Sequence, residues 1–230
     1  MPYEDGKRVL AVIPARGGSK RLPNKNLRMF SGKPLIAWTI IEARKCSLID
    51  EVWVSTDSPD IAKIAISYGA IVPSLRSPEN SEDSSLSISA MRETIEKAPN
   101  FEVVVMLQPT SPLRSEHHIS EALTLYKNLQ APVVSVKKAT DTPFWMFVKN
   151  ESGRLESLFP EYLVKRSQNL EDTYSLNGAI YIDEIQRLLR NNTFIQEETY
   201  PYEMDSESSM DIDTLEDFNS AEMVMKSRQL

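Results

Sequence analysis

Short apolar runs alternate with stretches of helical periodicity over the first 136 residues. Four runs are apolar at nearly every position, as expected of strands buried on both faces of a parallel sheet; they cover residues 9–13, 52–55, 101–107 and 132–136. Between them, apolar residues recur at helical spacing and predict helices at 34–46, 59–68 and 84–98, and from about residue 116. This alternation predicts an α/β fold with a mostly parallel sheet flanked by helices.

The alternation stops at residue 139. Residues 139–176 contain Trp145, Phe147 and a turn sequence at 150–153, but no helical period, and they predict an irregular β-rich insertion. A strand at 177–182 and a helix from about residue 214 follow. We interpret residues 1–230 as one domain that contains this insertion.

Polar loops follow three of the predicted strands, at residues 14–26, 55–58 and 108–115. Ligands of open α/β sheets bind beyond the carboxyl ends of the strands. We therefore expect these three loops to build the functional site.

Composition narrows the class of protein. The chain carries 26 Lys and Arg against 33 Asp and Glu, a formal charge of −7, so binding to nucleic acid or to an anionic membrane is not expected. No window approaches the ~18 apolar residues of a membrane span. Cys46 is the sole cysteine, which excludes an intrachain disulfide and a cysteine-based zinc site and favours a reducing, cytoplasmic setting.

The charges are segregated along the chain. Residues 7–41 contain eight basic residues and no acidic one, whereas residues 191–225 contain ten acidic residues and no basic one. Such segregation indicates either two unrelated solvated segments or two halves of a site that holds an anion and a cation together.

The basic block contains the loop PARGGSKRLPNKN at residues 14–26. Gly17 and Gly18 allow backbone N–H groups to approach phosphate oxygens closely. The basic side chains of the loop are Arg16, Lys20, Arg21 and Lys25. A flexible, solvated loop explains the composition equally well, but the position after the first buried strand favours phosphate binding.

This loop resembles the first motif of the N-acylneuraminate cytidylyltransferases. Five further segments resemble motifs of that family in the same order: VSTDS (54–58), LRSPEN (75–80), LQPTSPLR (107–114), NGAIYI (177–182) and MDIDTLEDF (210–218). The resemblance covers nearly the whole chain and implies a Rossmann-like fold of the nucleotidyltransferase type.

The resemblance also implies a reaction, in which CTP and a nonulosonic acid give the CMP-sugar and pyrophosphate. N-acetylneuraminate is the first candidate for the sugar. The same chemistry on legionaminate or a 3-deoxy-octulosonate is an alternative, and a CTP-binding module without catalysis is another.

Matching the family motifs residue by residue implies three sets of site residues. The nucleotide-binding set is Arg16, Gly17, Ser19, Lys20, Lys25, Asn26 and Arg76. The sugar-binding set is Gln108 and Tyr181, and the Mg²⁺ ligands are Asp211 and Asp213. The resemblance implies that Lys25, Arg16 and Asp213 act in catalysis, and it singles out no general base.

Asp211 and Asp213 also have a purely structural interpretation. At positions i and i+2 of an extended segment their carboxylates face the same way and could share Mg²⁺ with phosphate oxygens and water. Asp213 could instead cap the last helix, because Asp is a favoured N-cap residue. The residues alone favour the cap, and the resemblance favours the metal.

Several other residues have two interpretations. We expect Asp57 to cap the helix that follows it, ahead of any role in orienting the nucleotide or its loop, and Arg114 to be a structural anchor. Tyr181 could face the core or the sugar. His117 and His118 are expected at a solvated helix start. One of four serines is expected to reach the nucleotide: Ser84, Ser85, Ser87 or Ser89.

The insertion at 139–176 corresponds to the segment through which the family forms a domain-swapped dimer. Its aromatic residues therefore predict a homodimer, although they could instead cover the chain's own core. Two arginines of the family pattern are replaced here by Ser167 and Ser175, and Arg166 or Lys165 could substitute after a one-residue shift. This departure concerns the sugar and leaves the nucleotide chemistry unchanged.

Overall fold

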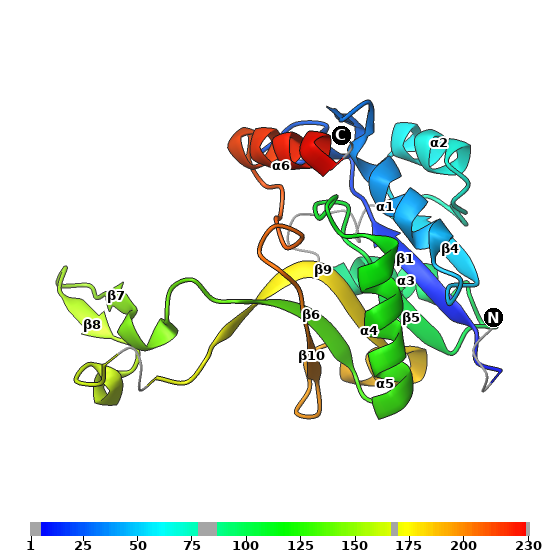
Figure 1. Ribbon diagram of the computed structural model, residues 1–230. Coiled ribbons are helices and arrows are strands. Elements are labelled where there is room, and N and C mark those ends of the chain that lie inside the picture. The colour runs from blue at the N-terminus through cyan, green and yellow to red at the C-terminus, as the bar shows by residue number, and fades with distance from the viewer. Residues whose placement is uncertain (1–5, 78–86, 167–169, 229–230) are drawn as a thin grey trace.

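A six-stranded sheet, ordered β10-β6-β9-β5-β1-β4, forms the centre of the molecule (Figure 1). The computed structural model describes residues 6–77, 87–166 and 170–228. The strands are β1 (Val9–Pro14), β4 (Glu51–Ser55), β5 (Val103–Met106), β6 (Val133–Lys138), β9 (Tyr174–Glu184) and β10 (Tyr200–Glu203). Among the described strands of this sheet, only β9 runs antiparallel to its neighbours, β5 and β6. The predicted mostly parallel α/β sheet is therefore confirmed.

Helices cover both faces of this sheet. The helices are α1 (Leu35–Lys45), α2 (Pro59–Ser67), α3 (Ser87–Ile95), α4 (Glu116–Leu129), α5 (Ile185–Asn191) and α6 (Leu215–Arg228). In β1, Val9, Ala11 and Ile13 pack in the core under α1, α2 and α4. Leu10 and Val12 pack in the core under α3 and α5. Burial on both faces explains why β1 is apolar at every position.

Helix α6 covers the loops that follow the strands. Its Phe218 and Ala221 belong to a third apolar cluster, together with Leu22 of the basic loop, Leu113 of the loop after β5, and Ile212. This packing brings the C-terminal acidic segment to the carboxyl edge of the sheet, where the basic loop also lies. None of the helices in the described part of the chain is long and apolar enough to cross a membrane.

Some elements differ from the sequence prediction. Helix α5 and strand β10 were not predicted, and β9 begins at Tyr174, earlier than the predicted strand at 177–182. Helix α3 ends at Ile95, before the predicted end, and its predicted start at residue 84 lies outside the described residues. A two-stranded hairpin of β2 (Met29–Phe30) and β3 (Lys33–Pro34) precedes α1, after the 3-10 turn η1 (Lys25–Leu27).

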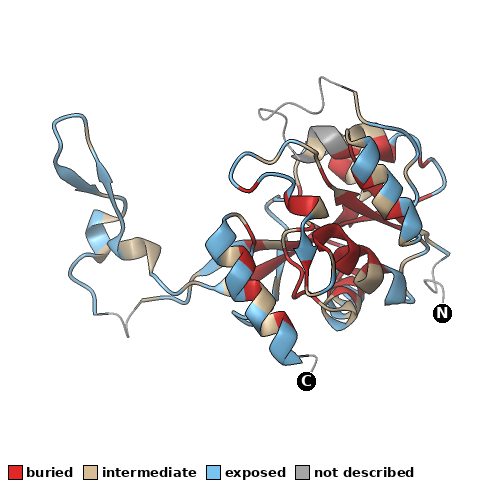
Figure 2. Ribbon diagram, turned by 90° about the horizontal axis from the view of Figure 1, so that it is seen from above, coloured by how far each residue is buried: buried red, intermediate tan, exposed pale blue. Residues whose placement is uncertain are grey.

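Residues 139–166 and 170–173, between β6 and β9 in the chain, leave the sheet and form an arm that projects from the body (Figures 1 and 2). The arm carries η2 (Pro143–Trp145), the hairpin β7 (Phe147–Lys149) and β8 (Leu155–Ser157), and η3 (Pro160–Tyr162). Phe144 and Tyr162 stack with ring centroids 4.3 Å apart. The alternative in which these aromatic residues cover the chain's own core is wrong, because the arm stands clear of that core.

Candidate active site

The basic loop and the acidic segment meet at the carboxyl edge of the sheet. Lys25 is buried, and its Nζ lies 2.5 Å from the carbonyl oxygen of Ile212 and 3.1 Å from Oδ1 of Asp213. Arg21 Nη1 lies 2.6 Å from the other carboxylate oxygen, Oδ2 of Asp213. Residues almost two hundred positions apart therefore form one charged cluster.

Local structure fixes Lys25 inside this cluster. Asn24 adopts a left-handed conformation with φ of 56°, which turns the chain into η1. Asn26 is buried, and its side-chain amide donates to the carbonyl oxygen of Arg16 at 3.0 Å, closing the loop on itself. Leu22 anchors the same loop in the apolar cluster beneath α6.

Asp211 and Asp213 lie on either side of Ile212, which is fully buried and donates its N–H to the Thr110 carbonyl oxygen at 2.9 Å. Alternation along this extended segment places the two carboxylates on the side opposite the buried Ile212. Asp211 keeps solvent access, but the surrounding protein removes part of its hydration and raises its pKa. The hydrogen bond from Thr110 opposes this shift, and the charge of Asp213 adds to it.

The alternative role of Asp213 as a helix cap is wrong. The first helical hydrogen bond of α6 ends on the carbonyl oxygen of Thr214. Thr214 Oγ1 accepts the Asp217 N–H at 3.2 Å, and the Asp217 carboxylate accepts the Thr214 N–H at 2.8 Å. Thr214 and Asp217 thus form the capping box, and both oxygens of Asp213 bind Arg21 and Lys25 instead.

The glycines of the basic loop have different surroundings. The Gly17 N–H donates to Oδ1 of Asp57 at 2.8 Å, and the Ser19 N–H donates to the Gly17 carbonyl oxygen at 3.2 Å. A Cβ at Gly18 would meet nothing within 4 Å, so this peptide is open to an incoming group. Lys20 of the same loop is also exposed.

Arg76 lies beside this loop rather than on it. Its Nη2 donates to the Ser55 carbonyl oxygen at 3.0 Å, and its backbone N–H donates to the Thr56 carbonyl oxygen at 2.8 Å. Burial lowers the pKa of Arg76, the charge of Asp57 opposes that shift, and the charge of Arg16 adds to it. Arg16, Asp57 and Arg76 are therefore electrostatic neighbours.

Gln108 of the loop after β5 approaches a bulge in β9. Gly178 has φ of +77°, and a Cβ there would lie 2.7 Å from Gln108 Oε1.

The predicted structural anchor, Arg114, is fully buried and donates to the carbonyl oxygens of Gln108 and Ala179 at 3.1 and 2.9 Å. Burial lowers the pKa of Arg114 to about 9. The anchor interpretation of Arg114 therefore agrees with the structure.

Tyr181 lies between the core and the acidic segment. Its ring centroid lies 5.6 Å from that of Phe194, in the core under α3 and α5. Burial and the nearby negative charge of Asp211 raise the pKa of the Tyr181 hydroxyl. The ring therefore packs in the core while the hydroxyl is within electrostatic range of the acidic segment.

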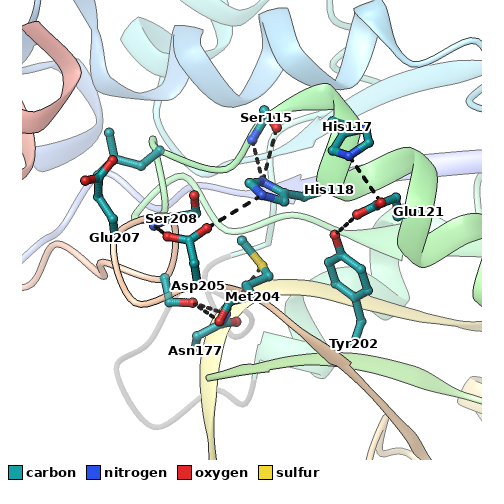
Figure 3. Close-up of polar contacts among 12 residues, drawn as sticks. Ser115, His117, His118, Glu121, Asn177, Tyr202, Met204, Asp205, Glu207 and Ser208 are labelled. Atoms are coloured by element: carbon teal, nitrogen blue, oxygen red, sulfur yellow. Dashed lines mark hydrogen bonds and ion pairs between the residues drawn. The ribbon is translucent and has the colours of Figure 1, made fainter. Parts of the chain in front are cut away.

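Figure 3 shows the anchoring of the turn that leads into this segment. His118 Nδ1 accepts the Ser115 N–H at 3.1 Å, and its Nε2 lies 4.0 Å from Oδ2 of Asp205. Asp205 Oδ1 accepts the Ser208 N–H at 2.8 Å. Of the two histidines predicted to be solvated, only His117 is exposed, because His118 packs between α4 and this turn.

Some of the remaining predicted residues lie outside the described part of the chain, and others lie within it. Ser84, Ser85 and Ser167 lie outside the described residues, and Ser175 lies on β9 opposite Lys137. Within the described ranges, no three His, Cys, Asp or Glu side chains gather as a complete metal site. The sequence indicates that Arg21 adds charge to the basic loop and that Asp57 caps a helix first, but it does not indicate their bonds to Asp213 and Gly17, which join separate loops.

Comparison with known proteins places the chain among cytidylyltransferases. A profile of the family described as "Cytidylyltransferase" matches residues 10–230. The chain is 41% identical over 229 residues to the CMP-N,N'-diacetyllegionaminic acid synthase of Legionella pneumophila, covering 96% of this chain and 98% of that protein.

Two further similarities, to a relative and to a solved structure, agree with this family. The chain is 35% identical over 212 residues to the N-acylneuraminate cytidylyltransferase of Streptococcus agalactiae; the match covers 91% of this chain but about half, 51%, of that relative. The solved structure of CMP:2-keto-3-deoxy-manno-octonic acid synthetase complexed with CTP has the same fold, with a TM-score of 0.74, 20% identity, and coverage of 97% of this chain and 100% of that chain. The chain therefore belongs to the cytidylyltransferase family.

Proposed function

We propose that this chain transfers CMP from CTP to the anomeric 2-hydroxyl of a nonulosonic acid and releases pyrophosphate. The observation that carries the proposal is the meeting of Lys25 and Arg21 with Asp213 beyond the ends of the strands. In this arrangement, cationic side chains that suit a triphosphate lie beside carboxylates that suit a divalent ion. Membership of the cytidylyltransferase family supports CTP as the nucleotide.

Asp211 and Asp213 suit Mg²⁺, which prefers carboxylate oxygens and keeps several waters. They are close enough for the charge of Asp213 to raise the pKa of Asp211, and a divalent ion would relieve this repulsion. Two protein carboxylates leave positions for phosphate oxygens and water. Bound there, Mg²⁺ would neutralise charge on the phosphates.

The basic residues would act by holding phosphate oxygens. In-line attack of a sugar hydroxyl on the α-phosphate depends on positioning and charge neutralisation more than on covalent help. Lys25 and Arg21 pair with Asp213 in the structure, and we expect them to turn to the phosphates when nucleotide binds. Arg16 and Lys20 of the same loop would add positive charge that stabilises the negative charge of the departing pyrophosphate.

Gln108 would position the sugar, since it lies on the loop beside the β9 bulge and close to Gly178. N-acetylneuraminate is the sugar to which the sequence motifs point. A second candidate is N,N'-diacetyllegionaminate, which is favoured by the 41% identity to the Legionella enzyme over nearly the full length of both chains.

Pyrophosphate release in the presence of CTP and Mg²⁺ tests the proposal. Parallel reactions would contain N-acetylneuraminate, N,N'-diacetyllegionaminate or a 3-deoxy-octulosonate, with CTP alone as the blank. We expect rapid release with one of the nonulosonic acids and the largest kcat/KM for the natural substrate. Binding of CTP without turnover on any of these sugars would favour a non-catalytic module and contradict the proposal.

A further inference from the structure

Asp57 stands between β4 and α2, where its carboxylate is available for a role outside the helix. The N-cap of α2 is Ser58, whose Oγ accepts the Ile61 N–H at 3.4 Å, and Pro59 occupies the first helical position. The expected capping role of Asp57 is therefore wrong. Its Oδ1 crosses to the basic loop instead and accepts the Gly17 N–H at 2.8 Å.

The contact with Gly17 is closely packed. A Cβ at residue 17 would lie 3.1 Å from Ser58 Cβ and 3.8 Å from Oδ1 of Asp57, whereas Gly18 has open space around it. The first glycine is thus held against the loop after β4, and the second faces outward. A charge-assisted bond to a backbone N–H is among the stronger hydrogen bonds in proteins, so Asp57 fixes the direction in which the Gly17–Gly18 turn opens.

Asp57 also connects this turn to the neighbouring cations. Arg76 lies within electrostatic range of Asp57 and is itself tied to the carbonyl oxygen of Ser55. The same carbonyl oxygen accepts the Ala15 N–H at 2.8 Å, at the start of the basic loop. The carboxylate thus lies where the basic loop, the end of β4 and Arg76 converge.

We propose that Asp57 is a positioning residue for nucleotide binding, which presets the Gly17–Gly18 turn through the Gly17 N–H and orients Arg76 beside it. This inference rests on the proposed function. A carboxylate near a triphosphate would repel it, so its net benefit must come from the loop geometry that it holds. Asp57 acts through Gly17 and Arg76 and needs no contact with the reacting atoms.

The test compares CTP binding by wild-type protein, Asp57→Ala, Asp57→Asn and Ser58→Ala, measured by calorimetry without sugar. Asp57→Ala removes the acceptor, and we expect CTP affinity to fall about ten- to a hundredfold, the range for a bond to a charged group. Asp57→Asn keeps an acceptor oxygen for the Gly17 N–H and should recover most of this loss. Ser58→Ala keeps the Cβ against Gly17 and loses only the α2 cap, so it should lower Tm without weakening CTP binding.

Steady-state kinetics gives a second readout. Asp57→Ala should raise KM for CTP while leaving KM for the sugar within about twofold, because the turn contacts the nucleotide alone. Equal CTP affinity in Asp57→Ala and wild type would overturn this inference alone. If Ser58→Ala lost as much CTP affinity as Asp57→Ala, the inference would also be overturned, because the loss would then follow from lower stability in general. If wild-type protein does not bind CTP, the proposed function fails and this inference fails with it.

Discussion

The amine of Lys25 is buried, and a buried charge is costly unless it is paired and hydrogen-bonded. The Ile212 carbonyl oxygen and the Asp213 carboxylate meet this need. The same contacts hold the amine at a fixed place beside the acidic segment. Lys25 is therefore oriented before any ligand arrives, and a phosphate oxygen could replace the carboxylate as its partner.

We expect Lys25→Ala to lower kcat about a hundredfold or more, the size of effect seen when a preorganised donor to transition-state charge is removed. Circular dichroism should show an intact fold. Lys33→Ala is the matched control, because it removes the same charge from the same basic block but its amine lies over Trp38, 4.7 Å from the ring centroid. Near-normal turnover in Lys25→Ala, or an equal loss in both variants, would remove Lys25 from the site.

His118 connects protonation to stability. Burial lowers its pKa from the ordinary value of 6.5, with the Asp205 charge opposing. Its Nδ1 must be unprotonated to accept the Ser115 N–H. A depressed folded-state pKa means that the stability contribution is complete above pH 6.5 and is lost as the pH falls below that value towards the folded-state pKa.

Urea unfolding at pH 7.5 and 5.5 measures this contribution. We expect the free energy of unfolding of His118→Gln to fall less between the two pH values than that of the wild type. His117→Gln should behave like the wild type, because His117 is exposed. An unchanged pH dependence in His118→Gln would contradict the assignment.

At the residue scale, motif resemblance led to most of the candidate site, but pairings between loops were not predictable. Arg21 and Asp213 are 192 positions apart, and Gly17 and Asp57 are 40 positions apart. Neither spacing carries a periodic signal, so only the fold reveals which partners meet. The cap of α6 was likewise not predictable, because Asp213 and Thr214 are adjacent and both are favoured cap residues, and only the hydrogen bonds of the fold show that Thr214 is the cap.

At the scale of elements, the bulge in β9 links the sheet to the loop after β5. Ser135 of β6 spans the bulge: its hydroxyl donates to Asn177 Oδ1 at 2.5 Å and accepts the Ile180 N–H at 2.7 Å. Asn177 is buried, and Gly178 follows with a positive φ. The bulge therefore brings the backbone of Gly178 against Gln108, where a side chain would not fit.

Gly178→Ala tests this contact. The added methyl is strained by the backbone conformation and would displace Gln108, so we expect KM for the sugar to rise about tenfold, the cost of one lost polar contact. CTP affinity should change little. Gly153→Ala is the matched control, with φ of +79° in the arm hairpin and no contact closer than 3.6 Å for its Cβ. Unchanged sugar KM in Gly178→Ala would contradict a sugar-positioning role for Gln108.

The buried elements could be predicted because burial leaves a clear pattern. β1 and β5 are covered on both faces and are apolar throughout. β10 has the sequence YPYE at an exposed edge of the sheet, and its proline and half-exposed tyrosines give no alternation. α5 has only seven residues and follows β9 directly, which is too short for a helical period to stand out.

At the scale of the whole molecule, the arm has more apolar surface than a monomer needs. In the described part of the arm, eight large apolar side chains are exposed: Trp145, Met146, Phe147, Val148, Leu155, Leu158, Leu163 and Val164. They lie on a projection that stands away from the body (Figure 2). Large apolar side chains exposed in such numbers on one projection are typical of an interaction site, and we expect a second copy of the chain to cover them.

Light scattering after size-exclusion chromatography tests this expectation. Wild-type protein should have twice the chain mass of 26.1 kDa, and Leu155→Glu combined with Val164→Glu should shift it to the monomer mass. Met223→Glu on α6 is the matched control, because Met223 and Leu155 are each 73% exposed. A monomeric wild type at micromolar concentration would contradict the homodimer.

The two charged blocks become one site only through the whole fold, since α6 must pack over both loops for Lys25 and Asp213 to meet. Most residues of each block lie outside this contact. We therefore expect the triphosphate to bind a few of the basic residues, and the metal to bind Asp211 and Asp213.

A crystal structure of the protein with CTP and Mg²⁺ would show whether these residues bind the nucleotide and the metal. We expect Lys25 and Arg21 to leave Asp213 and to lie within hydrogen-bond distance of phosphate oxygens, while Asp211 and Asp213 ligate the metal. CTP bound elsewhere, with the pairs between Lys25, Arg21 and Asp213 intact, would contradict this expectation.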